Sequence, residues 1–492
     1  MSFEAMLATR AFELGRAQRT ALYRHRAIAG TPFGIVAFEL GAEPYTVGSI
    51  ALGRQGRTPT IFVPGQPIDR RLLFHAITGF AREFCDTFEG YAAGNVETVQ
   101  HWGEDLEIPV SLPQIIVPNE QTIKLLYRLG RRLAYLKTDG PTPADPSLPR
   151  LGLHLMWLTR YARTQGQQLL VPLSQFLRQH YATAMSSYEA GSLAALEAWI
   201  DPPAGSTGPE AAAATELQAV GPTLSPSDAA EVSRLMEHFD ERRQRSIDPK
   251  VYTPLLGPLR TFYAAKTQHT WTLLWKAVAR ERKVALAASV GRREREDRIE
   301  YARHMQWMNG PAQGRLRART HLRSNVISKR RLEAAQALVE AEEAIDDPLR
   351  MVPQIVAGLA LAGEVVNLAA GRRELVGQRN CLRPSITVRT DENCSMPIGT
   401  ALWWTDAAAS REWLLSSVVP VGSGSDVTLI LQTNRQLSAG FPAFGSRVRF
   451  TQKPIPDSYE PILPSTVPWT HKAPETPVDD LDPPNAAESE AA

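Results

Sequence analysis

The hydrophobic period of the chain changes once, near Asp347, and this change limits the folds open to it. Through the helical middle of the chain, apolar residues recur at helical spacing. Beyond Asp347 they alternate in short runs separated by turn residues such as GSGSD and DENC. So many short strands within about 90 residues are typical of a small antiparallel β-barrel. The expected strands are 364–368, 373–376, 385–389, 400–405, 412–421, 426–433 and 446–452.

The N-terminal part combines strand patterns with helical patterns. Its three β-rich runs are GIVAFEL, TVGSIALG and TPTIFVPG, and a helical pattern follows over 68–89 with Asp69 as the expected N-cap. The run PQIIVP then precedes a second cap, Asn119, and a second helix over 120–136. This order predicts a small α/β domain over 1–137.

The segment 138–150 contains four prolines and cannot continue a helix, so it is the expected domain boundary. A mainly helical domain over 151–346 follows. Within it, 201–228 is rich in Pro, Gly, Ala and Ser and is expected to be a flexible loop, after which Asp228 and Glu231 fit a capping box.

A nearly continuous helical pattern covers 256–308, with a break near Gly291, and a last helix is expected over 327–345. The barrel domain is assigned to 347–455. The remainder, 456–492, is acidic and rich in proline and is expected to be disordered. The predicted fold class is therefore α+β and multidomain, with an α/β start, a helical middle and a C-terminal antiparallel barrel.

Charge is unevenly distributed along the chain. The net charge is only +2, from 54 basic and 52 acidic residues. The segment 280–331 alone holds fifteen Lys/Arg and five Asp/Glu, a net +10, so the rest of the chain carries −8. Within it, 311–331 has seven basic residues and no acidic one. Such a cluster favours phosphate binding, and nearby aromatic residues can stack on unpaired bases.

The candidate nucleic-acid-binding residues are the basic and aromatic side chains of this segment: Arg303, Trp307, Arg315, Arg317, Arg319, Arg323, Lys329, Arg330 and Arg331. Two other interpretations stay open. The patch is a solvated face that pairs with acidic residues elsewhere in the chain, or it docks on an acidic protein partner. The partner is nucleic acid, either DNA or RNA, and phosphate contacts of this kind carry no base information.

Sequence motifs for catalysis or for metal binding are lacking. None of the nine lysines sits in a phosphate-binding G-x-x-x-x-G-K-[ST] loop, and no histidine pair has metal-ligand spacing. Cys85 lies on an apolar helical pattern and is expected to be a buried thiol. We therefore expect no cofactor, no metal and no enzymatic activity. One enzymatic alternative remains, a divalent-metal nuclease in the N-terminal domain using Asp105 and Glu107, with Glu104 and either Glu97 or Asp69.

The segment 397–452 is similar to the accessory 1B-type β-barrel of Upf1-like superfamily 1 helicases. The resemblance covers a strand with a G-x-x-L pattern, a strand beginning at a tryptophan, a glycine turn and a V-T-L-x-L strand. It is carried by Gly399, Leu402, Trp413, Val418, Val419, Val427, Leu429 and Leu431. The resemblance implies a barrel that holds nucleic acid beside a motor. Because this chain lacks the motor's phosphate-binding loop, a separate ATPase would have to supply it.

Together these features predict a cytoplasmic, non-enzymatic nucleic-acid-binding subunit of a multi-protein bacterial complex. It would be accessory to a separate ATPase, helicase or nuclease, with phage defence or DNA processing as possible settings. A protein–protein scaffold is the alternative. Three scattered cysteines and the absence of a long apolar run favour a reducing compartment and argue against a membrane span.

Overall fold

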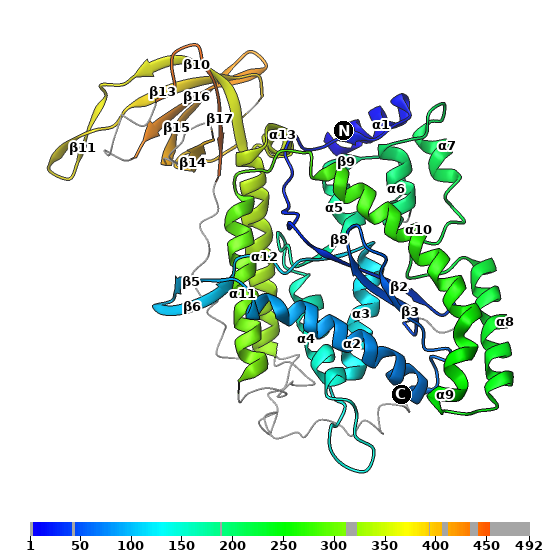
Figure 1. The fold of residues 1–492 in the computed structure, drawn as a ribbon. Coiled ribbons are helices and arrows are strands. Elements are labelled where there is room, and N and C mark those ends of the chain that lie inside the picture. The colour runs from blue at the N-terminus through cyan, green and yellow to red at the C-terminus, as the bar shows by residue number, and fades with distance from the viewer. Residues whose placement is uncertain are drawn as a thin grey trace, which may run out of the picture.

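A computed structural model describes residues 3–41, 45–186, 189–310, 322–392, 394–405, 412–432 and 441–452, with the side chains of α12 described from Asn325 onward. The described chain forms a body built on a central sheet, a pair of long helices along one side of that body, and a barrel at one end of the pair (Figure 1). The predicted fold class is confirmed: the N-terminal sheet is mixed, and the C-terminal region forms a closed six-stranded antiparallel barrel.

The central sheet has five strands in the order β4-β3-β2-β7-β8. Strands β2 and β3 pair in antiparallel fashion, as do β3 and β4, whereas β2, β7 and β8 run parallel. The bounds are β2 (Phe33–Glu39), β3 (Val47–Arg54), β4 (Thr60–Phe62), β7 (Ile115–Val117) and β8 (Leu170–Pro172). Strand β2 is central and buried along nearly its whole length, as its continuous apolar sequence predicts.

Helices cover both faces of this sheet. One face packs against α2 (Arg70–Ala93), α3 (Glu120–Leu133) and α4 (Ser147–Tyr161). The other face packs against α5 (Leu173–His180), α6 (Leu193–Ile200), α8 (Pro226–Arg243) and α10 (Gly257–Glu281). The caps at Asp69 and Asn119 form as expected, each side chain accepting a hydrogen bond from a backbone N–H of the first turn.

A glycine pair explains how closely α10 approaches the sheet. Gly34 and Gly53 lie opposite each other on β2 and β3. A Cβ on Gly34 would lie 2.9 Å from the Trp271 ring, and a Cβ on Gly53 would lie 3.2 Å from it. The indole therefore fills a flat area that only glycine leaves open. Its Nε1–H donates to the Arg57 carbonyl.

The sheet draws on residues beyond the expected boundary at 138–150. Its last strand, β8, lies inside the region expected to be helical, and a three-residue strand is too short to show a period. The segment 201–228 is also more ordered than its composition predicts: it contains α7 (Gly208–Ala213) and buries Val220 and Leu224. Helix α8 begins one turn before the expected capping box, with Ser225 as its N-cap.

The remaining elements of the body are short or peripheral. Helix α1 (Phe3–Leu14) lies on the surface. Beside it lies a two-stranded sheet formed by β1 (Gln18–Arg19) and β9 (Tyr181–Ala182). A hairpin of β5 (Val96–His101) and β6 (Glu104–Pro109) extends from the body beside the long helices (Figure 1). The short helices η1 (Glu189–Gly191), α9 (Pro249–Tyr252) and η2 (Thr253–Leu256) complete it.

The two long helices are α11 (Val290–Asn309) and α12 (Leu322–Asp346), and we call them the helical stalk. The backbone N–H of Ser289 donates to Asp346, and Arg292 pairs with Glu342, so residue numbers rise along α11 as they fall along α12. The stalk is therefore an antiparallel pair. The helical break that the sequence predicts near Gly291 lies a few residues earlier, over 282–289, between α10 and α11.

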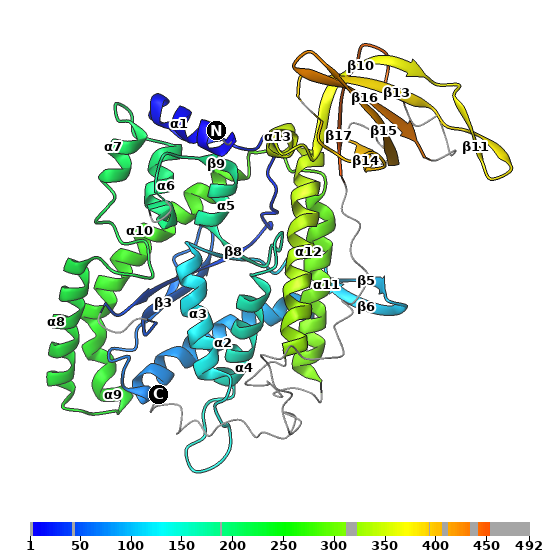
Figure 2. The same cartoon turned by 180° about the vertical axis from the view of Figure 1, so that it is seen from behind.

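The barrel follows α13 (Pro348–Val356) at one end of the stalk, and it lies away from the end where α11 stops and α12 starts (Figure 2). Its strand order is β10-β13-β16-β15-β14-β17. One of the seven expected strands, 373–376, lies outside the barrel: it forms β11 (Arg373–Val376), which pairs with β12 (Arg379–Leu382) in a projecting hairpin. The barrel strands are β10 (Ala360–Ala369), β13 (Ser385–Thr390), β14 (Ala401–Trp404), β15 (Glu412–Val421), β16 (Gly424–Leu431) and β17 (Arg447–Thr451).

The barrel core contains Leu402, Trp413, Val427 and Leu429, all nearly or fully buried. Trp413 packs against Phe450 of the closing strand with the two rings nearly perpendicular. Five of the eight residues on which the helicase resemblance rests thus fill the core, Leu431 being the fifth, whereas Val419 is exposed. Burial of this kind suits any small barrel and does not by itself distinguish one family from another.

One buried carboxylate joins the body, the stalk and the barrel. Asp347 is fully buried and caps α13 by accepting from the Leu349 backbone N–H. It also accepts from the backbone N–H groups of Leu22 and Tyr23 and lies 3.2 Å from His25 Nε2. Burial raises the pKa of the Asp347 carboxyl, but the hydrogen bonds from His25 and the three backbone groups outweigh it and hold that pKa below its ordinary value.

Removing this carboxylate should destabilise the junction strongly. We expect Asp347→Ala to lower the free energy of unfolding by about 3 kcal/mol, because it leaves buried donors without an acceptor. Asp347→Asn should lose less, since its amide oxygen still accepts from backbone N–H groups. Urea denaturation checks the order wild type, Asn, Ala. Equal midpoints for all three would contradict the role given to Asp347.

Candidate nucleic-acid interface

The basic segment 280–331 divides into two parts with different surroundings. In the first part, residues 280–310, most arginines meet acidic residues of the same chain. Arg280 pairs with Glu197 at 2.7 Å, Arg292 and Arg293 both face Glu342, and Arg298 pairs with Glu97 at 2.6 Å. This part of the patch therefore fits the interpretation in which basic residues pair with acidic residues elsewhere in the chain.

The start of α12 is different. Lys329, Arg330 and Arg331 are exposed, and the side chain of Lys329 is 79% exposed and meets only Glu333, at 3.6 Å. For Arg330 and Arg331, no ion pair is found with any residue that the structure describes. A pair as exposed as Lys329–Glu333 contributes little and leaves the lysine available to an external anion.

The other predicted phosphate contacts cannot be placed. Arg315, Arg317 and Arg319 fall outside the described residues, and so does the side chain of Arg323. In the sequence they connect α11 to Lys329–Arg331 and bring seven basic residues together without an acidic one. Of these seven side chains, the structure describes those of Lys329, Arg330 and Arg331, and all three are exposed.

The structure changes the choice of aromatic residue. Trp307 is half-buried and lies beside His304, whose ring stacks on Trp157 at 4.0 Å between centroids. Arg303 meets Glu300 and lies 3.9 Å from the centroid of the Trp102 ring. Trp102, at the tip of the β5–β6 hairpin, is 85% exposed. Trp102 is not among the residues predicted to bind nucleic acid, although the Trp-Gly pair is a turn signal that could have indicated its exposure.

The sheet edge where open α/β sheets commonly hold a ligand is filled by the chain itself. Ligands of such sheets bind at the carboxyl ends of the strands, where strand order reverses. Here that edge lies at Glu39 of β2 and Asn119 after β7. Asn119 donates to the Gly221 carbonyl, and Glu39 accepts from Thr223. The loop around Pro222 thus occupies the place of a ligand.

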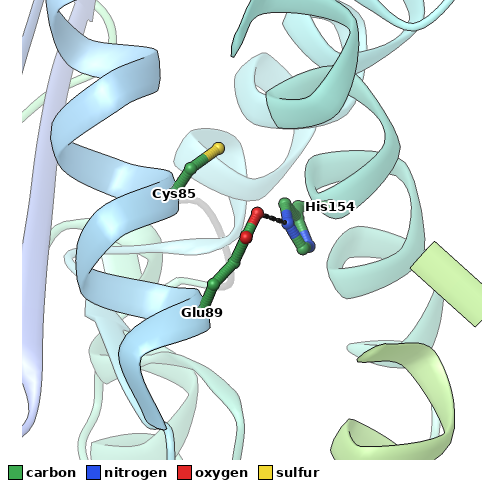
Figure 3. A group of neighbouring side chains, drawn as sticks. All are labelled: Cys85, Glu89 and His154. Carbon is green, nitrogen blue, oxygen red and sulfur yellow. Dashed lines mark hydrogen bonds and ion pairs between the residues drawn. The ribbon is translucent and has the colours of Figure 1, made fainter. Parts of the chain in front are cut away.

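A polar cluster connects α2 and α4 through Cys85, Glu89 and His154 (Figure 3), and His304 of α11 extends it. Glu89 accepts two hydrogen bonds from Arg150, at 2.5 and 2.7 Å, and lies 2.8 Å from His154 Nε2. His154 Nδ1 is 2.9 Å from His304 Nε2. One consistent arrangement of protons has His304 donating to His154 and His154 donating to Glu89. The Cys85 thiol lies beside Glu89, one helical turn earlier.

Cys85, Glu89 and His154 place one potential ligand atom each within 4.8 Å of one another, the single such trio in the described part of the chain. Burial and the Glu89 charge raise the pKa of the Cys85 thiol to about 12. Burial raises the pKa of Glu89, but hydrogen bonds from His154 and Arg150 lower it to about 2. The carboxylate already holds a guanidinium and an imidazole, and the thiol stays protonated. A divalent ion does not fit this set without displacing Arg150.

The residues of the nuclease hypothesis lie apart. Asp105 and Glu107 sit on the exposed outer face of the β5–β6 hairpin, and Asp105 accepts from the Gln100 amide. Asp69 caps α2 and faces Arg243. Glu97 pairs with Arg298. The structure therefore does not bring these carboxylates together into a set of metal ligands.

No known protein family, no curated protein and no solved structure matches this chain. Among the described helices, none is long and apolar enough to cross a membrane.

Metal removal gives a direct test of the buried cluster. We expect EDTA to leave the thermal unfolding midpoint unchanged, because Glu89 is neutralised by Arg150 and not by a metal ion. Glu89→Ala should lower the free energy of unfolding by about 3 kcal/mol, since it leaves Arg150 and His154 unpaired. A midpoint that falls with EDTA and recovers with Zn²⁺ would show that the cluster is a metal site.

The same cluster predicts an acid-sensitive fold. Burial, aided by the charge of Arg150 and by His154, lowers the pKa of His304 to about 2. Because the unfolded chain protonates a histidine near pH 6.5 and the folded chain does not, stability is full above that pH and decreases below it. We expect the thermal midpoint to fall from pH 7 to pH 5. The fall should be smaller in His304→Gln, relative to that variant's own midpoint at pH 7. Parallel profiles would contradict this account.

Proposed function

We propose that the chain is a nucleic-acid-binding subunit that contacts phosphates through the end of the stalk where α11 stops and α12 starts. The observation that carries the proposal is the run of seven basic residues without an acidic one over 311–331. Its described members, Lys329, Arg330 and Arg331, are exposed. Cations without a buried acidic partner are the ones free to release counterions from a phosphate backbone.

The contrast with the neighbouring arginines supports this assignment. Arg280, Arg293 and Arg298 have acidic partners and are buried or half-buried, so they serve packing. The described cations of 311–331, which lack a buried acidic partner, thus lie together at one end of the stalk. Because the barrel lies at the other end, a strand that touched both would have to follow the stalk (Figures 1 and 2).

As an extension of this proposal, the chain works beside a separate ATPase or nuclease in a multi-protein bacterial complex, with antiviral defence or DNA processing as the setting. The resemblance of the barrel to a helicase accessory element and the lack of a motor motif in the sequence support it. A protein scaffold whose basic patch docks an acidic partner is the second candidate, since the exposed Lys329, Arg330 and Arg331 suit an acidic protein surface as well as a phosphate. Purification of a stable complex free of nucleic acid would support the scaffold.

Salt dependence tests the nucleic-acid proposal. We expect fluorescence anisotropy with a labelled oligonucleotide to show affinity that falls by about 10³-fold between 50 and 200 mM salt if all seven cations contact phosphates. Arg317→Glu/Arg319→Glu should weaken binding to all sequences alike. The matched control Arg242→Glu/Arg260→Glu, on exposed helical positions of the body, should not. Affinity that is absent, or unchanged by salt, would refute the proposal.

A further inference from the structure

The tip of the β5–β6 hairpin holds an exposed tryptophan in a fixed position. Trp102 and Gly103 both have positive φ, 53° and 83°, and form the two central residues of the hairpin turn. The indole is 85% exposed, yet Arg303 lies over its ring at 3.9 Å and His101 lies beside it at 4.8 Å. A large aromatic side chain held rigidly in solvent is the kind of residue that anchors protein interfaces.

The hairpin around this tryptophan is acidic. Between 95 and 110 the chain has four acidic residues and no Lys or Arg. Glu97 pairs with Arg298, which packs the base of the hairpin on α11. Asp105 and Glu107 lie on one exposed strand face, since residues two apart on a strand point the same way. In the described structure neither has an ion-pair partner. This charge disfavours a phosphate backbone and favours a basic protein surface.

The same chain carries such a basic surface, Lys329–Arg331, at the same position along the stalk axis as the hairpin. Arg292 of α11 pairs with Glu342 of α12. Arg303 comes eleven residues after Arg292 on α11, and Arg331 comes eleven residues before Glu342 on α12. At about 1.5 Å per residue both lie roughly 16 Å from that pair. The acidic hairpin, fixed by Arg303, and the exposed cations of α12 therefore lie level with each other.

We propose that the β5–β6 hairpin docks on the start of α12 of a second copy of this chain, with Trp102 at the centre of the contact. A two-fold arrangement satisfies both surfaces at once: the acidic hairpin of each copy meets Lys329, Arg330 and Arg331 of the other. The contact is small and rich in exposed charges, so it is a weak, salt-sensitive dimer. Nucleic acid that binds the same cations would compete with the second copy.

Sedimentation velocity of the full chain, without nucleic acid, tests the dimer separately from the proposed function. From 1 to 100 μM in 50 mM salt we expect a shift from monomer to dimer that 500 mM salt abolishes. Trp102→Ala should weaken the dimer at least about tenfold, as loss of a central aromatic anchor does. A chain that stays monomeric at 100 μM in 50 mM salt would overturn the proposal.

Charge reversal supplies the decisive arm. Asp105→Lys/Glu107→Lys and Arg330→Glu/Arg331→Glu should each remain monomeric when alone, because each places like charges together. Mixed in equal amounts, the two variants should form a heterodimer, since the positive hairpin of the first meets the negative helix of the second. The control Glu237→Lys/Glu241→Lys, on the exposed face of α8, should dimerise like the wild type. Failure of the mixture to associate, with both variants folded by circular dichroism, would refute the two-fold contact.

Discussion

The carboxylate of Asp347 is the interaction on which the arrangement of the whole chain depends. It accepts hydrogen bonds from the chain between β1 and β2 while capping the helix that leads into the barrel. Around it, Arg293 donates to the His25 carbonyl, and Arg350 pairs with the buried Glu343. These contacts add to the packing of α11 in the body's core, and they fix the base of the stalk and the helix that leads into the barrel against the body.

This anchoring separates the two ends of the stalk in their chemistry. Near Asp347 the charged side chains are buried and have partners of opposite charge or hydrogen-bond donors, so they stabilise one arrangement of the junction. At the other end Lys329, Arg330 and Arg331 are exposed, with the Lys329–Glu333 contact as their one ion pair among the described residues, and they stay available to an external partner. A single pair of helices thus carries both a structural and a binding role. The net charge of +2 hides this division because the +10 of segment 280–331 is offset by −8 in the rest of the chain.

Much of this fold follows from local sequence signals. Asp69 and Asn119 begin helices because short polar side chains cap exposed N–H groups, and alternation after Asp347 gives barrel strands. Features that rest on distant contacts could not be predicted. Strand β8 exists because it pairs with β7, and three residues carry no period of their own. The ion pairs of Arg292 and Arg298 likewise depend on helices and strands that only the tertiary fold brings together.

The candidate site was predicted only in part. The exposure of Lys329, Arg330 and Arg331 follows from a sequence with no apolar stripe at that point, whereas the burial of Trp307 depends on Trp157 and His304. The position of Trp102 could not be predicted because the sequence HWGEDLEIP fits an exposed loop as well as a hairpin. Its hairpin becomes visible only once Val99, Leu106 and Ile108 are seen packed on α11.

The contact between residues 22–25 and Asp347 also sets an order of events during synthesis. The first strands of the sheet leave the ribosome early, but β8 must follow before the sheet is complete, and α10 must follow before Gly34 and Gly53 are covered by Trp271. The backbone N–H groups of Leu22 and Tyr23 gain their acceptor later still, because Asp347 lies more than 300 positions further along the chain. Contacts this distant in sequence are slow to form. The N-terminal segment of the nascent chain therefore lacks its final contacts until the stalk has emerged. The barrel is built from neighbouring strands, so it can fold last, against the folded body.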